Sequence, residues 1–268
     1  MTITERQSQI LNELVDQYIN SARPVSSQLL EKKHDFGICP ATIRIEMQKL
    51  TDTGFLYQPH TSAGRVPTDK GYRFFVDNLL EKGSPKEKDI FKIEDLIERE
   101  IGDTVRFLQS LIKNLASFSS NSLALGYLFD EDLFWKEGWE DVLGEPEFKE
   151  TKVITDFADV IKHFEKEIED IKIDSRIKVY IGKENPFSKV KDFSIIISKC
   201  HLPEPQRSQR GKPLFHPSLR LGRVKKRIHP LRLPKKENGV LAIAGPKRMA
   251  YDKNINSLNS LTKLLEEL

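Results

Sequence analysis

Cysteine and long apolar runs are both scarce in this sequence. Cys39 and Cys200 are its only two thiols, and they form no Cys-x-x-Cys pair, so their spacing predicts neither a disulfide framework nor a zinc site. No stretch approaches the ~18 consecutive apolar residues of a membrane-spanning helix, and residues 1–6 contain no apolar signal core. We therefore expect a cytoplasmic protein with reduced thiols and no membrane partner.

Motifs for catalysis and cofactor binding are missing too. The sequence contains no G-x-S-x-G, no H-E-x-x-H and no phosphate-binding loop, and its six histidines are scattered. Carboxylates are plentiful, but they lie on predicted helix faces, where a solvated surface is their ordinary environment. We expect no enzymatic activity, no catalytic residue, no cofactor and no metal.

A large excess of one sign of charge is also lacking in the chain as a whole, and one segment is the exception. The chain has 43 basic and 40 acidic residues, and residues 1–80 hold nine of each, so composition alone does not indicate DNA. Residues 205–236 contain eleven Lys or Arg and no Asp or Glu. Their lack of periodicity predicts a disordered insert over residues 203–237. Two roles fit this insert: a solvated loop, or a source of non-specific DNA affinity.

The first 82 residues show the pattern of helices followed by a hairpin. Periodicity and capping residues predict helices over residues 4–20, 26–33 and 40–53, and another from residue 68. Thr4 and Gln7 form the capping-box pattern of the first helix. Residues 55–67 are typical of a strand, a hairpin tip and an exit strand. This order predicts a winged helix-turn-helix DNA-binding domain over residues 1–82.

The third helix is the candidate reading helix, because the second helix of a helix-turn-helix lies in the major groove. Its outer face, opposite the apolar stripe, carries Ala41, Thr42, Arg44, Ile45, Gln48 and Lys49. We predict that Arg44 and Gln48 hydrogen-bond base edges and that Lys49 contacts a phosphate. Ile45 is either a thymine-methyl contact or simply an exposed isoleucine.

Two other segments supply candidate DNA contacts. They are the start of the second helix and the hairpin tip, with Ser26, Ser27, His60, Thr61, Ser62 and Arg65. Helix N-termini favour phosphate, although the serines also serve as plain N-caps. We expect the tip to place Arg65 in a minor groove or on a phosphate.

The rest of the chain predicts a connecting helix and a second domain. Residues 83–118 are a linker followed by a long helix from residue 86, whose apolar residues recur every three or four positions. That spacing fits a coiled-coil-like seam or a helix packed on its own domain. In residues 119–268, strands are predicted over residues 123–129, 177–181, 193–198 and 239–244, with helices over 157–171 and at the C-terminus. The fold class is therefore α+β.

Six stretches resemble one known family. PVSS at 24–27, ATIR at 41–44 and PHTSAGRVPTDKGYR at 59–73 are similar to the N-terminal domain of the heat-inducible repressor family HrcA. GKENP at 182–186, GPKRMAY at 245–251 and, more weakly, LGEPEF at 143–148 resemble segments of that family's GAF-like C-terminal domain. The resemblance implies a reduced GAF-like regulatory and dimerisation domain over residues 119–268.

The resemblance also implies function and partners. It implies a bacterial, nucleoid-associated homodimer that represses chaperone genes at an inverted-repeat operator called CIRCE, with the chaperonin GroEL as a partner. The chain departs from the family in its short length, in missing strands near residues 129–133 together with the inserted dimerisation subdomain, and in Ile45, where the family usually has Asn. The basic segment has no recognised counterpart. The alternatives are a winged-helix protein-interaction module and a ligand-sensing repressor of other genes.

Overall fold

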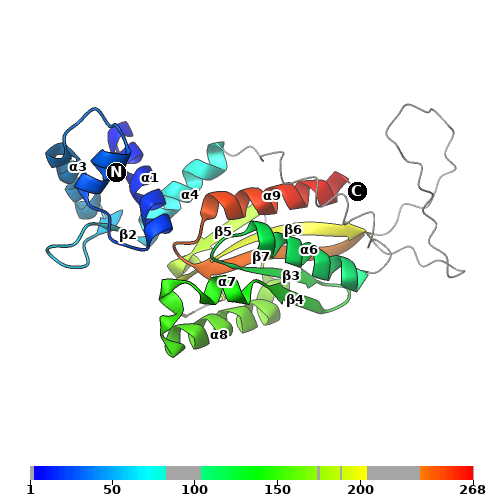
Figure 1. Ribbon diagram of the computed structural model, residues 1–268. Coiled ribbons are helices and arrows are strands. Elements are labelled where there is room, and N and C mark those ends of the chain that lie inside the picture. Colours follow the sequence, from blue (N-terminus) through cyan, green and yellow to red (C-terminus); the bar gives the residue numbers. More distant parts are fainter. Residues whose placement is uncertain (1–2, 83–103, 174–175, 188, 204–235, 268) are drawn as a thin grey trace, which may run out of the picture.

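The computed structural model describes residues 3–82, 104–173, 176–187, 189–203 and 236–267 (Figure 1). Nearly all of the predicted basic insert and residues 86–103 of the predicted long helix therefore lie outside the described residues. The chain is α+β, with an N-terminal unit that ends with α4 and a C-terminal sheet domain that begins with α6. Within the described ranges, no helix is long and apolar enough to cross a membrane.

The N-terminal unit consists of four helices and a two-stranded hairpin. Its elements are α1 (Glu5–Ser21), α2 (Ser27–Lys33), α3 (Pro40–Asp52), β1 (Leu56–Tyr57), β2 (Val66–Pro67) and α4 (Asp69–Lys82). The two strands pair antiparallel, with Leu56 opposite Pro67. The predicted order of these elements and their approximate bounds are confirmed.

Local capping explains where the helices begin. The Thr4 hydroxyl accepts a hydrogen bond from Gln7 N (3.2 Å), and the Gln7 side chain accepts one from Thr4 N (3.0 Å), which completes the predicted capping box. Ser26 Oγ accepts from Leu29 N (3.2 Å) at the start of α2. Pro40 occupies the first turn of α3, where its missing N–H leaves no helical hydrogen bond unmade.

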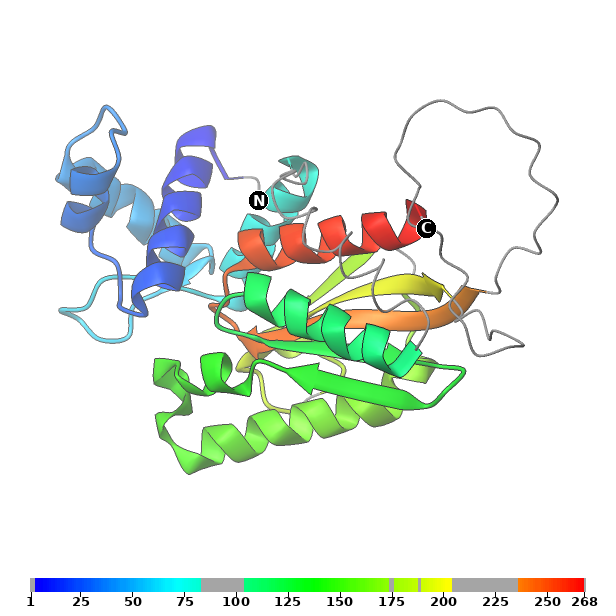
Figure 2. The ribbon, with the colours of Figure 1, turned by 45° about the vertical axis from the view of Figure 1, so that its right-hand side comes forward.

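The C-terminal domain is built on one antiparallel sheet. Its strands are β3 (Leu123–Leu128), β4 (Leu133–Glu137), β5 (Ile177–Ile181), β6 (Phe193–Pro203) and β7 (Lys236–Pro246), in the spatial order β4-β3-β7-β6-β5. Its helices are α6 (Thr104–Phe118), α7 (Trp139–Leu143), α8 (Thr151–Glu167) and α9 (Tyr251–Glu267), with 3₁₀ turns at Pro146–Lys149, Ile168–Asp170 and Gly182–Glu184. α6 and α9 cover one face of the sheet and α8 covers the other (Figure 2).

β4 was not predicted from the sequence, whereas the prediction that strands near residues 129–133 are missing is not contradicted, because residues 129–132 form a turn between β3 and β4. Leu133, Phe134 and Trp135 follow one another, so the strand lacks the alternation of apolar and polar residues that a sequence pattern detects. β4 nevertheless pairs with β3 along its whole length, from Leu133 to Glu137. The sheet is therefore wider than the sequence indicates.

Three further elements differ from their predicted bounds. α8 begins at Thr151, before the predicted start at residue 157, and ends at Glu167 in a 3₁₀ turn. β6 and β7 are longer than predicted, because their ladder continues to the pair formed by Pro203 and Lys236. The basic segment between them is thus attached to the two ends of a β-hairpin.

The described part of the long connecting helix packs on its own domain. Leu108, Ile112 and Leu115 of α6 are fully buried against the sheet. Gly126 of β3 makes this approach possible, because a Cβ there would lie 2.6 Å from Ile112 Cδ1. For Thr104–Phe118 the packed-helix alternative is correct and the coiled-coil-like seam is not. The apolar residues of α9 are buried in the same way.

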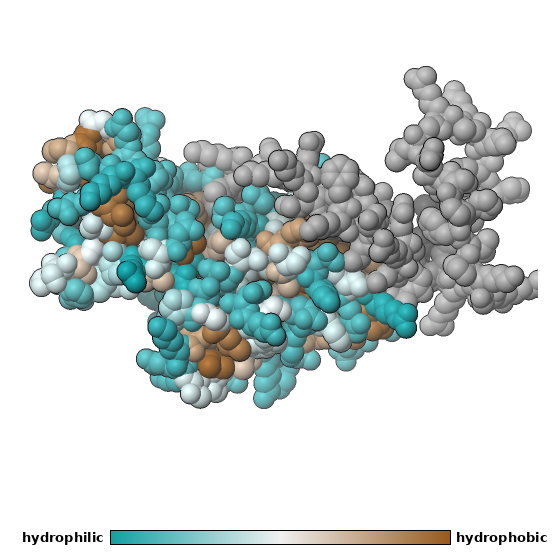
Figure 3. Space-filling view, in the orientation of Figure 1, coloured by the Kyte–Doolittle hydropathy of each residue, from teal (hydrophilic) through white to brown (hydrophobic). Residues whose placement is uncertain are grey.

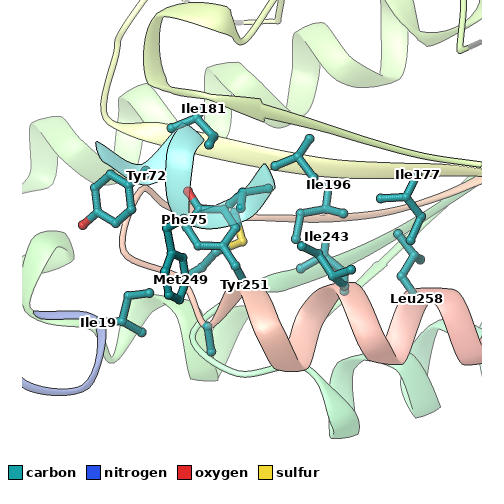
Figure 4. Close-up of a cluster of buried hydrophobic side chains, with 14 of the residues drawn as sticks. Ile19, Tyr72, Phe75, Ile177, Ile181, Ile196, Ile243, Met249, Tyr251 and Leu258 are labelled. Atoms are coloured by element: carbon teal, nitrogen blue, oxygen red, sulfur yellow. The ribbon is translucent and has the colours of Figure 1, made fainter. Parts of the chain in front are cut away.

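An apolar cluster joins the two units. Tyr72 of α4 and Tyr251 of α9 are both buried, with ring centroids 5.9 Å apart. Ile19, Phe75 and Met249 pack around them, and this cluster is continuous with the core between the sheet and α9 (Figure 4). The two units therefore share one hydrophobic core at this junction.

Ion pairs surround the cluster. They are Arg73–Glu184, Lys247–Asp69, Arg248–Glu145 and Arg248–Glu147. Arg248 Nη1 also donates to the Ile19 carbonyl of α1 (3.0 Å), and Arg73 Nη2 donates to the Val179 carbonyl of β5 (2.6 Å). These charged residues come from residues 59–73, 143–148, 182–186 and 245–251. Four of the six stretches that carry the family resemblance thus meet at the junction.

Candidate nucleic-acid interface

The predicted outer face of α3 is exposed. Ile43, Met47 and Leu50 point into the core, and the outer residues Ala41, Arg44, Ile45, Gln48 and Lys49 are accessible. Thr42 is half-buried, with its hydroxyl 3.4 Å from Cys39 Sγ. Ile45 is 56% exposed, more than the other exposed large hydrophobic side chains of the described residues, Tyr57, Val105 and Leu143. The visible surface of the N-terminal unit is otherwise largely hydrophilic (Figure 3).

Two of the predicted contact residues are engaged by their neighbours. Lys49 Nζ donates to Glu46 Oε1 (2.8 Å), and this bond, together with one from Gln7, lowers the pKa of the Glu46 carboxyl. Gln48 Nε2 donates to Asp52 Oδ1 (2.8 Å), and its Oε1 accepts from Arg65 (2.7 Å). Sequence analysis missed Glu46 and Asp52, although their spacings of three and four residues along the helix favour such pairs.

Arg44 differs from these residues. In the described part of the chain, its guanidinium has neither a hydrogen-bond partner nor an ion-pair partner. Its side chain is exposed at the edge of α3 that faces the hairpin. Arg44 is therefore the predicted reader with the most freedom to bind DNA.

The hairpin tip is a compact, exposed loop. Gln58 Nε2 donates to the carbonyls of Thr61 (2.9 Å) and Ala63 (2.8 Å), which closes the loop on itself. His60 Nδ1 lies 3.1 Å from Ser62 Oγ. His60, Thr61 and Ser62 are all exposed, as a DNA-contacting wing requires. Gln58 organises the tip but was not singled out from the sequence.

Arg65 is not where the sequence analysis placed it. Its side chain is buried, not extended from the tip, and it donates from Nε to Thr51 Oγ1 (3.0 Å). The cause is a backbone bridge between Arg65 and Val25, which turns the side chain onto α3. Burial, together with the like charge of Arg44, lowers the pKa of Arg65.

These segments enclose a shallow hollow of about 330 Å³ between α2, α3 and the hairpin tip. Six predicted site residues line it: Ser26, Ser27, Arg44, Thr61, Ser62 and Arg65. No Asp or Glu is among its lining residues. The exposed Arg44 and several hydroxyls provide hydrogen-bond donors without a competing anion in the lining, which is the chemistry that binds phosphate. The other six, Ala41, Thr42, Ile45, Gln48, Lys49 and His60, are not among its lining residues.

A larger hollow of about 780 Å³ lies at the junction of the two units. Its lining mixes tyrosines with charges of both signs, and Lys247 is already paired with Asp69. That balance does not favour a polyanion. Among the described residues, no cluster of three His, Cys, Asp or Glu side chains is placed to hold a metal.

This geometry defines an α+β protein of two units, in which the exposed face of α3 lies beside a hollow lined by basic and hydroxyl side chains. The HrcA protein C-terminal domain profile matches residues 78–255, which is more than half of the chain. This chain belongs to the HrcA family.

Relatives support this assignment. Over 111 residues the chain is 41% identical to the heat-inducible transcription repressor HrcA of Acetivibrio thermocellus, covering 41% of this chain and 32% of the relative. That match, like several others, spans about a third of the relative's length. The HrcA of Natranaerobius thermophilus aligns over 100% of this chain and 98% of its own length, at 25% identity.

One solved structure has the same fold. A crystal structure described as that of a hypothetical protein superposes with a TM-score of 0.73, covering 99% of this chain and 98% of its own. Its sequence identity is 19%, so the match concerns the fold alone.

Proposed function

We propose that this protein is a DNA-binding transcription repressor of heat-shock genes and that residues 1–82 act as its winged-helix domain. The observation that carries the proposal is the exposed face of α3 beside the basic, hydroxyl-lined hollow. An α-helix fits the major groove, and donors beside it fix the helix on the phosphate backbone. The relatives' printed name, heat-inducible transcription repressor, gives the class of regulated genes.

The target in this proposal is an inverted repeat bound by a homodimer in the bacterial cytoplasm, at the nucleoid. Two reading helices on one face of the duplex need half-sites separated by whole turns, ~10–10.5 bp each. The buried apolar faces of α6 (Thr104–Phe118) and α9 are occupied within the chain, so these two faces are not proposed as the dimer surface. Three further roles belong to this proposal as predictions: GroEL is a partner, the sheet domain is a GAF-like regulatory domain, and the basic insert adds affinity for DNA.

A protein-interaction module explains the hollow less well. Arg44 and several hydroxyls line the hollow, and no Asp or Glu is among its lining residues. An anion such as a DNA phosphate therefore complements the hollow better than a neutral protein surface does. For the ligand-sensing alternative, the junction hollow is the larger site, but several of its charged residues already pair with one another or with neighbours, as Lys247 does with Asp69.

The test has two parts. Genome-wide footprinting before and after a heat shift is expected to reveal protected inverted repeats upstream of chaperone genes, with protection lost on heating. Titration of the purified protein on such a duplex is expected to show affinity that falls steeply with salt, because bound phosphates release counterions. Salt-independent binding, or no protected site, would contradict the proposal.

A further inference from the structure

Arg65 connects the three segments that form the candidate interface. Its backbone pairs with Val25, immediately before α2, through Val25 N to Arg65 O (2.9 Å) and Arg65 N to Val25 O (2.8 Å). Its guanidinium donates to Thr51 Oγ1 (3.0 Å) and Gln48 Oε1 (2.7 Å), both on α3. Arg65 itself directly precedes β2 of the hairpin. One residue therefore links α2, α3 and the hairpin.

The backbone fixes the place of this guanidinium. Gly64 lies so close to Val25 that a Cβ on Gly64 would overlap the Val25 carbonyl oxygen. The close approach aligns Arg65 for its two backbone bonds, and its side chain is then directed onto α3, where only 8% of the residue is exposed. A side chain held in this way has little freedom to extend toward a phosphate.

The contact with Arg65 also sets the orientation of Gln48. An arginine has only donors, so the amide oxygen of Gln48 faces Arg65 and the amide nitrogen faces Asp52. Recognition of adenine by glutamine uses both ends of that amide at once. Gln48 is therefore not free to form the two hydrogen bonds to an adenine edge that its position on the outer face of α3 suggests.

We propose that Arg65 is a positioning residue for DNA recognition: it holds Gln48 and Thr51 of α3 in register with α2 and the hairpin, and it contacts neither base nor phosphate. The inference rests on the proposed function. It assigns direct reading and phosphate binding to Arg44 and its neighbours, and it explains why a buried arginine lies beneath an exposed binding surface.

The test uses full-length protein and two duplexes: one selected by the wild-type protein from a random library, and a scrambled control. For Arg65→Ala we expect a loss of about tenfold in preference for the selected duplex, with an unchanged slope of log K against log salt. Loss of a phosphate contact would instead reduce that slope by about 0.9. Arg65→Lys is expected to behave like Arg65→Ala, because an ammonium cannot reproduce the two-pronged guanidinium geometry.

Thr51→Val removes one acceptor of the Arg65 side chain and leaves every charge in place, so it carries the test if Arg65→Ala does not fold. It is expected to lower the preference by a smaller factor, again with an unchanged slope. Arg65→Ala and Gln48→Ala are expected to be non-additive, because the two side chains act as one unit. Arg176→Ala, on the distant sheet domain, is the control and is expected to match the wild type.

A reduced slope with unchanged preference in Arg65→Lys or Arg65→Ala would overturn the inference and leave the proposed function standing, since Arg65 would then be a phosphate contact. Additive losses for Arg65 and Gln48 would also overturn it. If the wild-type protein selects no duplex, the proposed function fails and the inference fails with it.

Discussion

The junction between the two units and the outer side of the N-terminal unit use arginine in opposite ways. At the junction, Arg248 is buried between Glu145 and Glu147, and these carboxylates raise its pKa although burial alone lowers it. On the outer side, Arg44 is exposed and, within the described residues, has no partner. The nearby Arg65 has a lowered pKa, because burial is reinforced by the like charge of Arg44. Paired charges maintain the fold at the junction, and the exposed Arg44 remains available on the outer side.

This contrast predicts that the same substitution has different consequences on the two sides. Removal of a junction arginine should affect the free energy of unfolding. Removal of an outer arginine should affect DNA binding and leave the fold unchanged, because exposed substitutions usually change stability by less than about 0.5 kcal/mol.

The largest expected effect is that of Arg248→Ala. It leaves two carboxylates without their cation and removes the hydrogen bond to Ile19 O, so the free energy of unfolding should fall by about 3 kcal/mol. Urea denaturation measures it. The matched control is Arg176→Ala, whose arginine pairs with Glu266 at the surface and should cost no more than about 1 kcal/mol. Equal losses for the two variants would remove the distinction between the junction and the surface.

Arg44→Ala should change DNA binding and leave the free energy of unfolding unchanged, the opposite of Arg248→Ala. We expect specific DNA binding to weaken by about 1–3 kcal/mol if Arg44 reads a base, with the urea midpoint unchanged. Titrations against the protected operator and a scrambled duplex give the measurement. Equal losses on both duplexes would show that Arg44 contacts phosphate only, and a lowered urea midpoint would place it among the structural arginines.

Two glycines with positive φ, one at the junction and one on the outer side, allow a second comparison of the two regions. Gly182 at the junction has φ +53°, and a Cβ there would lie 2.6 Å from Asp69 Oδ2. Gly37, in the loop before α3, has φ +65° and open space around its Cα. Both alanine variants incur backbone strain, but Gly182→Ala also displaces Asp69, so it should lose about 1 kcal/mol more on thermal or urea unfolding. Equal losses would mean that the Asp69 contact contributes nothing.

The smallest effect concerns Ile45. If it packs on a thymine methyl, replacement of that thymine by uracil should weaken wild-type binding by no more than about 0.8 kcal/mol, the value of one buried methyl-sized group. Ile45→Ala should abolish the difference between thymine and uracil. A wild-type protein that binds both duplexes equally would leave Ile45 as a plain exposed isoleucine.

The features of this structure that could be predicted from the sequence are those determined by residues only a few positions apart in the chain. The Thr4–Gln7 capping box, the start of α3 at Pro40 and the outer face of α3 depend on spacings of a few positions. The edge strand β4 was not predicted, because Leu133, Phe134 and Trp135 follow one another without polar residues between them and all three are half-buried. Periodicity therefore predicts an element only where its two faces differ in environment.

Contacts between residues far apart in the sequence could not be predicted, for a different reason. Arg65 turns inward because its backbone meets Val25, forty positions earlier, and no local pattern encodes that approach. The bond from Arg248 to Ile19 spans 229 positions. Similar motifs indicated that these stretches matter, but only the fold shows that four of them meet at one junction.

The β6–β7 hairpin has a consequence for the basic segment that it carries. The two strands meet the junction at Phe193 and Pro246, and the segment is attached at their other ends, at Pro203 and Lys236. Ten strand residues at about 3.3 Å each separate these ends by roughly 33 Å. Ions screen charges over only about 8 Å at physiological salt, so a charge at this end of the ladder, such as that of Lys236, does not reach the junction end through the electric field.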